Sequence, residues 1–135
     1  MIVADTNVIV PLLVRTAQSA VIEQLYSRKS DWYAPQLWRS ELTNVLLTFV
    51  RKQLITPPEA RTALNEAPLV VPPDNELRPD PQDILALALA SGCTAYDCEY
   101  IATAKLLGIP LATWDKQLLT NFPNDAFTPE HLLNI

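Results

Sequence analysis

The stretch that decides the fold is Ile-Val-Ala-Asp-Thr-Asn at residues 2–7. Three apolar residues end abruptly at Asp5, which is typical of a short buried strand that runs directly into a turn. Short apolar runs of the same kind recur at residues 32–34, 69–71 and 110–113, and each ends at a proline or a polar turn. We therefore expect four strands, the first of which begins almost at the N-terminus.

Helical patterns separate these predicted strands. Apolar residues at helical spacing, together with capping and stop residues, predict helices over 8–14, 19–29, 36–53, 56–67, 80–91, 94–107 and 116–121. Strands that alternate with helices, without hairpin signals, favour an α/β fold with a central parallel sheet and helices on both faces. No linker or repeat divides the 135 residues, so we expect one domain over 1–135.

The composition excludes several kinds of catalytic site. Two glycines, Gly92 and Gly108, are too few and too far apart for a phosphate-binding glycine loop or a dinucleotide turn. A single histidine, His131, leaves a serine or cysteine triad without a base. Cys93 and Cys98 lack the two further ligands of a tetrahedral zinc site, and they fit a reducing compartment better than a disulfide framework. Any chemistry therefore falls mainly to carboxylates.

The charge and the hydrophobic pattern bear on partners and location. A net charge of −5 argues against nonspecific binding to nucleic acid, although a local basic rim around an acidic site is compatible with it. The N-terminus lacks the basic segment of a signal peptide. The longest apolar run, between Asp83 and Asp97, is too short to span a bilayer. We expect a cytoplasmic protein that does not enter a membrane.

Two acids follow predicted strands directly. Asp5 comes after the first strand and Asp115 after the strand over 110–113. An open parallel sheet binds its ligand beyond the carboxyl ends of its strands, so both residues are candidates for a functional site. Each also has a purely structural interpretation, since aspartate is a common residue in Asx turns and at helix N-caps.

Glu41 lies on the apolar stripe of the longest predicted helix. It follows Trp38 by three residues and precedes Val45 by four, so these side chains share one face. A carboxylate on a face that packs into the core needs a hydrogen-bonding partner, a cation or a proton. Pairing with Arg39 or with another arginine at the edge of the stripe is one way to satisfy it, and a metal or catalytic pocket is the interpretation that we prefer.

Asp97 is the fourth acid of interest. It lies three residues after Thr94, at the third helical position of the capping box that Thr94 opens, and a first-turn acid also faces the space in front of its helix. Four carboxylates that converge without a compensating cation repel one another and raise their own pKa values. Mg²⁺ or Mn²⁺ relieves this repulsion, because both ions prefer oxygen ligands. The pattern favours metal-assisted hydrolysis of a phosphodiester.

At these residues the sequence resembles the PIN-domain proteins, specifically the VapC-like toxins of bacterial toxin–antitoxin systems. The resemblance covers essentially the whole chain and rests on four elements in order: residues 5–7 after the first strand, 40–42 in the long helix, 95–102, and 110–115. None of these four elements alone is specific for the family, but the four in this order make a strong combined signal. The resemblance implies a three-layer α/β/α fold and a metal-dependent ribonuclease.

The resemblance also implies roles for individual residues. Asp5 and Asp97 would be the principal Mg²⁺ ligands, Glu41 would complete the acidic cluster and orient water, and Asp115 would support a second metal or a water ligand. The polar neighbours of these acids would hydrogen-bond the carboxylates, and they are Thr6, Asn7 and Thr113. Trp114 is bulkier than the residue usual before the last acid, and we expect it to serve packing.

The partners implied are an RNA substrate, a cognate antitoxin that inserts a segment near the acids, and a second copy of the chain in a homodimer. The leading hypothesis is thus an Mg²⁺-dependent endoribonuclease that acts as a toxin. A housekeeping RNA-processing nuclease with the same fold is an alternative that the residues do not separate from it. A catalytically inactive PIN-like binding module is a third hypothesis, against which the presence of all four acids argues.

Overall fold

The computed structural model describes residues 1–134. Its sheet has five strands in the order β3-β2-β1-β4-β5, and every neighbouring pair is parallel. The strands are β1 Ile2–Ala4, β2 Trp32–Pro35, β3 Glu76–Leu77, β4 Leu111–Ala112 and β5 Ala126–Phe127. The predicted parallel sheet is confirmed.

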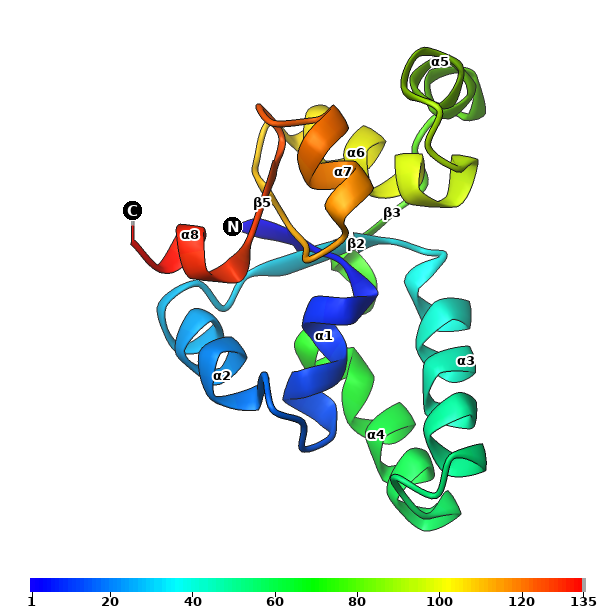
Figure 1. Cartoon of the computed structure of the whole chain (residues 1–135), viewed down its shortest axis with the longest axis vertical. Coiled ribbons are helices and arrows are strands. Elements are labelled where there is room, and N and C mark those ends of the chain that lie inside the picture. Colours follow the sequence, from blue (N-terminus) through cyan, green and yellow to red (C-terminus); the bar gives the residue numbers. More distant parts are fainter. Residues whose placement is uncertain (135) are drawn as a thin grey trace.

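Helices cover both faces of this sheet, which gives the three-layer α/β/α architecture (Figure 1). The first four helices lie on one side in this view: α1 Thr6–Leu13, α2 Ser19–Arg28, α3 Trp38–Arg51 and α4 Pro57–Val70. On the other side lie α5 Pro81–Ser91, α6 Ala95–Leu107 and α7 Lys116–Asn121, with α5 packed against α6. The short helices η1 Pro73–Asn75 and α8 Pro129–Leu133 complete the set. In residues 1–134, no helix combines the length and the apolar character needed to cross a membrane.

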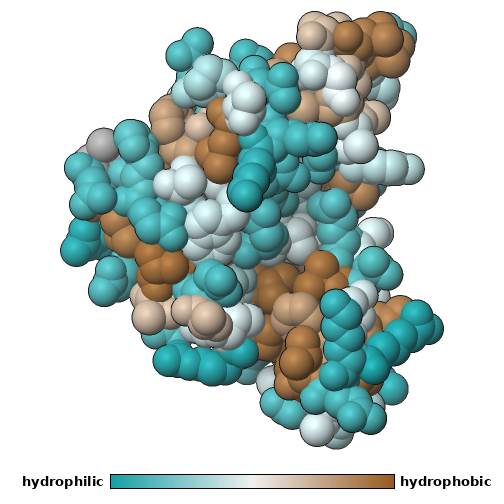
Figure 2. Space-filling model, viewed as in Figure 1, coloured by the Kyte–Doolittle hydropathy of each residue, from teal (hydrophilic) through white to brown (hydrophobic). Residues whose placement is uncertain are grey.

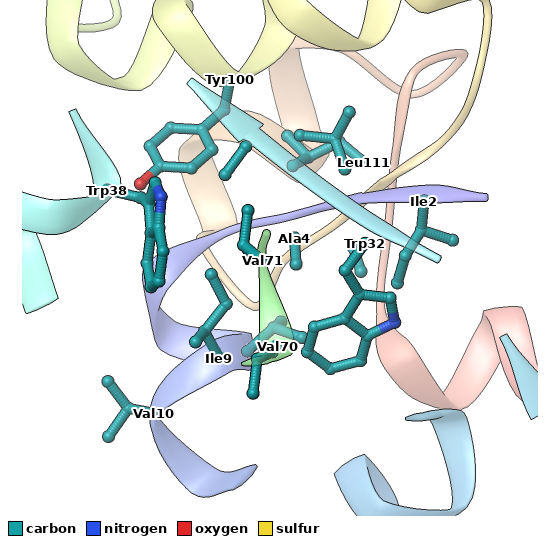
Figure 3. Packing of buried hydrophobic residues seen from close by; sticks show 14 of the residues in the cluster. Ile2, Ala4, Ile9, Val10, Trp32, Trp38, Val70, Val71, Tyr100 and Leu111 are labelled. Atoms are coloured by element: carbon teal, nitrogen blue, oxygen red, sulfur yellow. The ribbon is translucent and has the colours of Figure 1, made fainter. Parts of the chain in front are cut away.

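The hydrophobic core surrounds β1. Its three residues are fully buried, as a central strand of a parallel sheet with helices on both faces requires. Trp32 and Leu111, on the strands to either side, are fully buried with them, and Ile9 joins the cluster from α1 (Figure 3). This packing fixes the end of β1, and therefore the position of Asp5.

The sequence prediction of a strand at residues 69–71 is wrong. The helix α4 continues through Pro68 to Val70, and the third strand is β3 instead. Ala63, Ala67 and Val70 recur at helical spacing and are buried together, so their packing keeps the segment helical. Pro68 is exposed on the opposite face, where its missing N–H costs the helix one hydrogen bond.

Other boundaries also differ from the prediction, and two elements are additional to it. The helix α1 begins at Thr6 rather than residue 8, because Asp5 caps it, and Pro11 consequently lies inside it. The helix α3 begins at Trp38 rather than residue 36. The strand β5 and the helix α8 near the C-terminus were not predicted, since a two-residue strand shows no alternation that a pattern could reveal.

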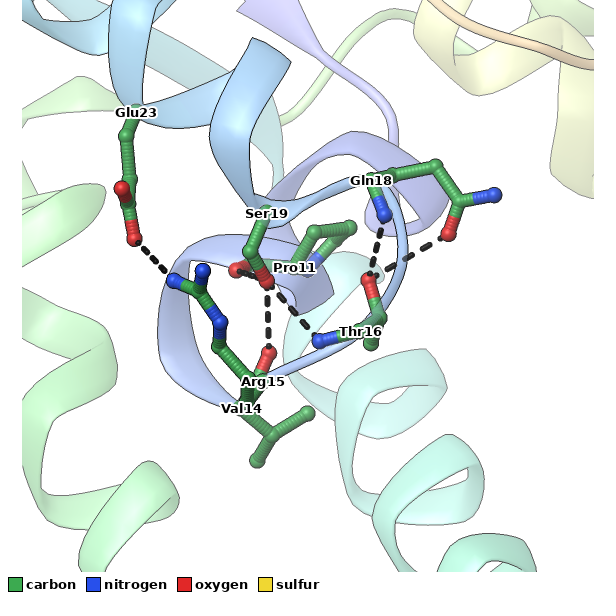
Figure 4. Close-up of polar contacts among 7 residues, drawn as sticks. All are labelled: Pro11, Val14, Arg15, Thr16, Gln18, Ser19 and Glu23. Carbon is green, nitrogen blue, oxygen red and sulfur yellow. Dashed lines mark hydrogen bonds and ion pairs between the residues drawn. The ribbon is translucent and has the colours of Figure 1, made fainter.

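A hydrogen-bonded corner joins α1 to α2 (Figure 4). The buried hydroxyl of Ser19 donates to the carbonyl oxygen of Pro11 at 2.7 Å and accepts from the backbone N–H of Thr16 at 2.9 Å. The hydroxyl of Thr16 accepts from the N–H of Gln18 at 3.1 Å. The corner is therefore ordered by local bonds, and it holds Thr16 and Gln18 at the wall of a pocket that α1 and α3 also line.

Candidate active site

Asp5 occupies the junction between β1 and α1. As N-cap of α1, its Oδ1 accepts a hydrogen bond from the N–H of Thr6 at 2.7 Å. Its Oδ2 accepts from the hydroxyl of Thr113 at 2.7 Å, and its own N–H donates to the carbonyl oxygen of Ala112 at 3.0 Å. Thr113 follows β4, so these bonds tie together the carboxyl ends of two neighbouring strands.

The electrostatics of Asp5 are unusual for a carboxylate. Its pKa is raised from 3.8 to about 7, mainly by burial and further by the negative charges of Glu41 and Asp97. The hydrogen bonds from Thr113 and Thr6 act in the opposite direction, but they do not offset the burial. A strongly shifted group of this kind is typical of functional sites.

Glu41 reaches the same region from the first turn of α3. Its Oε1 accepts hydrogen bonds from the hydroxyl of Tyr100 at 2.5 Å and from that of Thr6 at 3.2 Å. Arg39 does not pair with it, because the Arg39 guanidinium forms a two-point ion pair with Glu76. The interpretation of Glu41 as one half of an Arg39 pair is therefore wrong.

Asp97 and Asp115 combine capping with a place at the pocket. The N–H of Asp97 donates to the hydroxyl of Thr94, the N-cap of α6, at 3.1 Å. Asp115 caps α7 by accepting from the N–H of Leu118 at 3.1 Å. The pKa of Asp97 is raised by partial burial and then by the negative charge of Asp115, which repels the Asp97 carboxylate. Asp115 is therefore a helix cap as its structural interpretation predicts, the N–H of Asp97 takes part in the cap of α6, and both acids also line the pocket.

All four acids line one pocket of about 380 Å³, together with Thr6 and Asn7. Its remaining walls come from α1, the α1–α2 corner and α3, and consist of Val10, Pro11, Thr16, Gln18, Val45 and Phe49. Thr113 is fully buried behind Asp5 and does not line the pocket. The lining that the described chain provides contains no lysine, arginine or histidine.

The pocket lies where the order of the strands reverses direction. From β1 the chain proceeds outward to β2 and β3, and then crosses back to β4 and β5 on the other side. Open parallel sheets bind ligands beyond the carboxyl ends of the strands at such a point. Asp5 follows β1 and Asp115 follows β4, so both acids flank it.

The donor set suits a hard divalent cation, although the acids do not form a closed cage. Among residues 1–134, no three acidic, histidine or cysteine side chains lie close enough together to make a metal site by themselves. The acids share one pocket that lacks a basic side chain, and the burial of Asp5 penalises its charge. Mg²⁺ is commonly bound by only one or two carboxylates and keeps several waters, so an open acidic pocket fits its chemistry.

Tyr100 is a residue of this site that the sequence prediction missed. It is 1% exposed, and its hydroxyl contacts Glu41 and, at 2.8 Å, Thr6. Burial, followed by the charges of Asp5 and Glu41, raises its pKa well above the ordinary value. A signal was present, because Tyr100 lies three residues after Asp97 and so shares its helix face.

Two neighbours of the predicted acids lie outside the pocket lining. The indole N–H of Trp114 donates to the carboxylate of Glu130 on α8 at 3.0–3.1 Å, which agrees with a packing role. Glu99, two residues after Asp97 on α6, is half-buried, and its pKa is raised by burial and by the charge of Glu41.

The sequence and the fold of the chain are similar to those of known proteins. The PIN domain family matches residues 2–122. Ribonuclease VapC3 of Pyrobaculum aerophilum is 32% identical over 127 residues, covering 90% of this chain and 95% of the relative. Ribonuclease VapC1 of Mycobacterium tuberculosis is 31% identical over 117 residues, covering 86% of each chain.

A solved crystal structure of a Pyrobaculum aerophilum protein has the same fold. The TM-score is 0.77, and the alignment covers 98% of this chain and 92% of the other at 22% sequence identity. The family match extends over nearly the whole described chain and includes all four acids of the pocket. The chain therefore belongs to the PIN domain family, and within that family it is VapC-like.

Proposed function

We propose that the chain is an Mg²⁺-dependent endoribonuclease that hydrolyses RNA phosphodiester bonds and acts as the toxin of a toxin–antitoxin pair. One observation carries the proposal: four carboxylates line a single pocket at the strand-order reversal, and no basic side chain of the described residues lines it with them. The similarity to proteins named Ribonuclease VapC3 and VapC1 supports the choice of RNA as the substrate.

Each acid of the pocket would have its own role. Asp5 and Asp97 would be the principal Mg²⁺ ligands, with Mn²⁺ as a substitute; Glu41 would orient water, and Asp115 would support a second ion or a water ligand. When bound, the ion supplies charge neutralisation and water activation. Thr113 and the N–H of Thr6 hold both oxygens of Asp5 in place, which limits reorganisation when a ligand enters.

The pocket has two chemically different ends, which suits a nucleotide. The acids lie at the end nearest the sheet, and Val10, Val45 and Phe49 supply apolar walls from α1 and α3. Figure 2 shows apolar side chains gathered between α1 and α3, below a more hydrophilic surface. Single-stranded RNA presents unstacked bases, which bind to apolar and aromatic side chains, beside its phosphates.

The antitoxin and the homodimer are part of the same proposal. The surface of α5 supports the proposal of a homodimer. None of the residues of α5 is buried, and the apolar side chains of Leu85 and Leu89 are 54% and 78% exposed. Co-purification with the product of the adjacent gene would test the antitoxin. Size-exclusion chromatography of the purified chain would test the dimer, and mapping RNA ends after induction would identify the substrate.

The substitution Asp97→Asn tests the catalytic assignment. We expect RNA cleavage to fall by more than about 100-fold and toxicity to be relieved, because loss of a direct ligand should exceed the 10- to 100-fold cost typical of outer contacts. Cleavage of labelled RNA with Mg²⁺, with EDTA as the metal-free reference, measures the effect. Circular dichroism verifies that the variant is folded.

The control for this variant is Asp83→Asn. Asp83 occupies the third position of α5, as Asp97 does in α6, but it is exposed and lies outside the pocket. It therefore reproduces the loss of a first-turn charge without touching the site. Full Mg²⁺-dependent cleavage by Asp97→Asn would refute the assignment. Cleavage by the wild type in EDTA would refute metal dependence.

A further inference from the structure

The hydroxyl of Tyr100 is a buried group to which the proposed chemistry assigns no role. Tyr100 lies on α6, one turn after Asp97, and Glu41 lies on α3. Their contact at 2.5 Å is therefore a link between two helices that are far apart in the sequence. Thr6, the first residue of α1, contacts both of them and is itself 5% exposed.

The donors and acceptors in this group have one consistent arrangement. The Tyr100 hydroxyl has a single proton, and the bond to Glu41 uses it, since a carboxylate only accepts. In its 2.8 Å contact with Tyr100, Thr6 must then be the donor, and because Thr6 also has a single proton, its longer 3.2 Å contact with Glu41 Oε1 can only share that proton. The result is a chain from the Thr6 hydroxyl through the Tyr100 hydroxyl to Glu41 Oε1, in which each bond polarises the next.

This arrangement engages only one oxygen of Glu41. Both hydroxyl contacts go to Oε1, and no hydrogen bond from the described residues reaches Oε2. Because Glu41 lines the pocket, Oε2 is the oxygen left for a ligand. Glu41 also lacks an ion pair within residues 1–134, so hydroxyl donors alone hold its carboxylate.

We propose that Tyr100 is a positioning residue, which together with Thr6 holds Glu41 Oε1 so that Oε2 faces the metal pocket. The inference rests on the proposed function, since it concerns the same pocket. It predicts that Tyr100 acts on metal binding through Glu41, and only through Glu41. A tyrosine that merely filled space would have no such dependence, because phenylalanine fills nearly the same volume.

The test is Tyr100→Phe, with Mg²⁺ affinity measured by calorimetry in the absence of RNA. We expect the Kd for Mg²⁺ to rise by about 10-fold, the lower end of the range for a residue that orients a ligand. In cleavage assays at a fixed low Mg²⁺ concentration, kcat should fall while KM for RNA changes little. Tyr33→Phe is the control, because it removes a tyrosine hydroxyl that bonds to Asp31 outside the pocket.

A double-mutant cycle with Glu41→Gln separates positioning from packing. If Tyr100 acts through Glu41, Tyr100→Phe should have no further effect on Mg²⁺ affinity in the Glu41→Gln background. Equal effects in both backgrounds would overturn the inference. Should Tyr100→Phe fail to fold, Thr6→Val removes the outer donor of the same chain, and it should raise the Kd for Mg²⁺ several-fold while Thr6→Ser restores it. An unchanged Kd in Thr6→Val would also overturn the inference.

The outcomes separate this inference from the proposed function. A wild-type chain that neither binds Mg²⁺ nor cleaves RNA would refute the proposed function, and the inference with it. A wild-type chain that does both, alongside a Tyr100→Phe variant that matches it in Kd and kcat, would refute the inference alone. A lower thermal stability of Tyr100→Phe with an unchanged Kd for Mg²⁺ would likewise assign the hydroxyl a structural role.

Discussion

Asp5 stands where β1 ends and α1 begins, and its two oxygens are bonded to different elements. The N–H of Thr6 and the hydroxyl of Thr113 satisfy them, yet burial still raises the pKa of Asp5 to about 7. Below about pH 7 the metal-free native state therefore favours the protonated carboxyl, whereas a bound cation favours the carboxylate. Asp5 therefore caps α1, while the burial of its carboxylate costs stability and favours the binding of a metal ion in the pocket.

This shift predicts how the stability of the metal-free protein depends on pH. Since the native pKa of Asp5 is raised from 3.8 to about 7, the native state binds more protons than the unfolded state between these values. The stabilisation is complete below the unfolded pKa and is lost as the pH rises through the native pKa. Relative to Asp5→Asn, the unfolding free energy should fall by roughly 2 to 3 kcal/mol between about pH 5 and pH 8.

Urea unfolding of both proteins in EDTA over this pH range measures the difference. The Asp5→Asn variant is the reference because Asp97 and Glu99, whose pKa values are also raised, titrate in both proteins. In saturating Mg²⁺ the difference should shrink, since the cation stabilises the carboxylate. Parallel curves for the two proteins in EDTA would contradict the raised pKa.

The sequence identified the acids of the pocket but not Tyr100, for a physical reason. A strand end followed by an acid, or an acid in a capping box, is a local pattern that adjacent residues reveal. The partners of Tyr100 lie 94 residues away at Thr6 and 59 residues away at Glu41. The spacing from Asp97 places Tyr100 on the same helix face, but only the approach of α6 to α1 and α3 brings these partners to its hydroxyl, and no local pattern encodes that approach.

At the scale of single elements, α4 shows where local rules fail. Proline normally ends a helix, and Leu69, Val70 and Val71 have the composition of a strand, so a boundary at Pro68 is the natural expectation. The buried face formed by Ala63, Ala67 and Val70 outweighs the cost of the proline, and the helix runs on. Tertiary packing, which the sequence pattern does not show, decides between the two structures.

The substitution Pro68→Ala should therefore stabilise the protein. It restores the backbone N–H inside α4 and removes the ring. Pro68 lines a pocket with Trp38 and Leu42 of α3 but is exposed, so we expect the loss of packing to be small. A proline inside a helix costs about 3 kcal/mol, part of which is offset by its restriction of the unfolded chain. We expect the unfolding free energy in urea to rise by about 1 to 2 kcal/mol.

Pro58→Ala is the matched control in the same helix. Pro58 lies in the first turn of α4, where backbone N–H groups have no partner within the helix, so its replacement should change stability little. Equal stabilisation by the two substitutions would show that the missing hydrogen bond of Pro68 is not responsible for the gain. A destabilised Pro68→Ala variant would contradict the idea that α4 forms in spite of its internal proline.

At the scale of the whole molecule, the order of the strands creates the site. The alternation of strands and helices predicts a parallel sheet, and the structure confirms it, but alternation does not specify which strands are neighbours. Because β4 lies beside β1, Thr113 contacts Asp5. The same arrangement places Asp115 in the pocket that Glu41 and Asp97 also line. Four acids that are dispersed over more than one hundred residues of sequence thereby concentrate negative charge at one end of the sheet.

This concentration of charge predicts stabilisation of the fold by Mg²⁺. A ligand that binds only the native state stabilises it by about 2.7 kcal/mol at one hundred times its Kd, and each further tenfold increase adds about 1.4 kcal/mol. For a chain of this size we expect a rise in Tm of roughly 10 °C at one hundred times the Kd. Thermal scans across a series of Mg²⁺ concentrations measure it.

Two controls separate binding from general screening of the net charge of −5. NaCl at matched ionic strength screens all charges alike, so it should raise Tm much less than Mg²⁺ does. Asp97→Asn should lose most of the Mg²⁺-specific rise, whereas Asp83→Asn, at the corresponding position of α5, should keep it. Screening acts on the whole molecule, whereas coordination acts on one pocket. Equal Mg²⁺ responses of Asp97→Asn and Asp83→Asn would therefore contradict the acidic cluster as a metal site. A wild-type Tm that does not change with millimolar Mg²⁺ would contradict it as well.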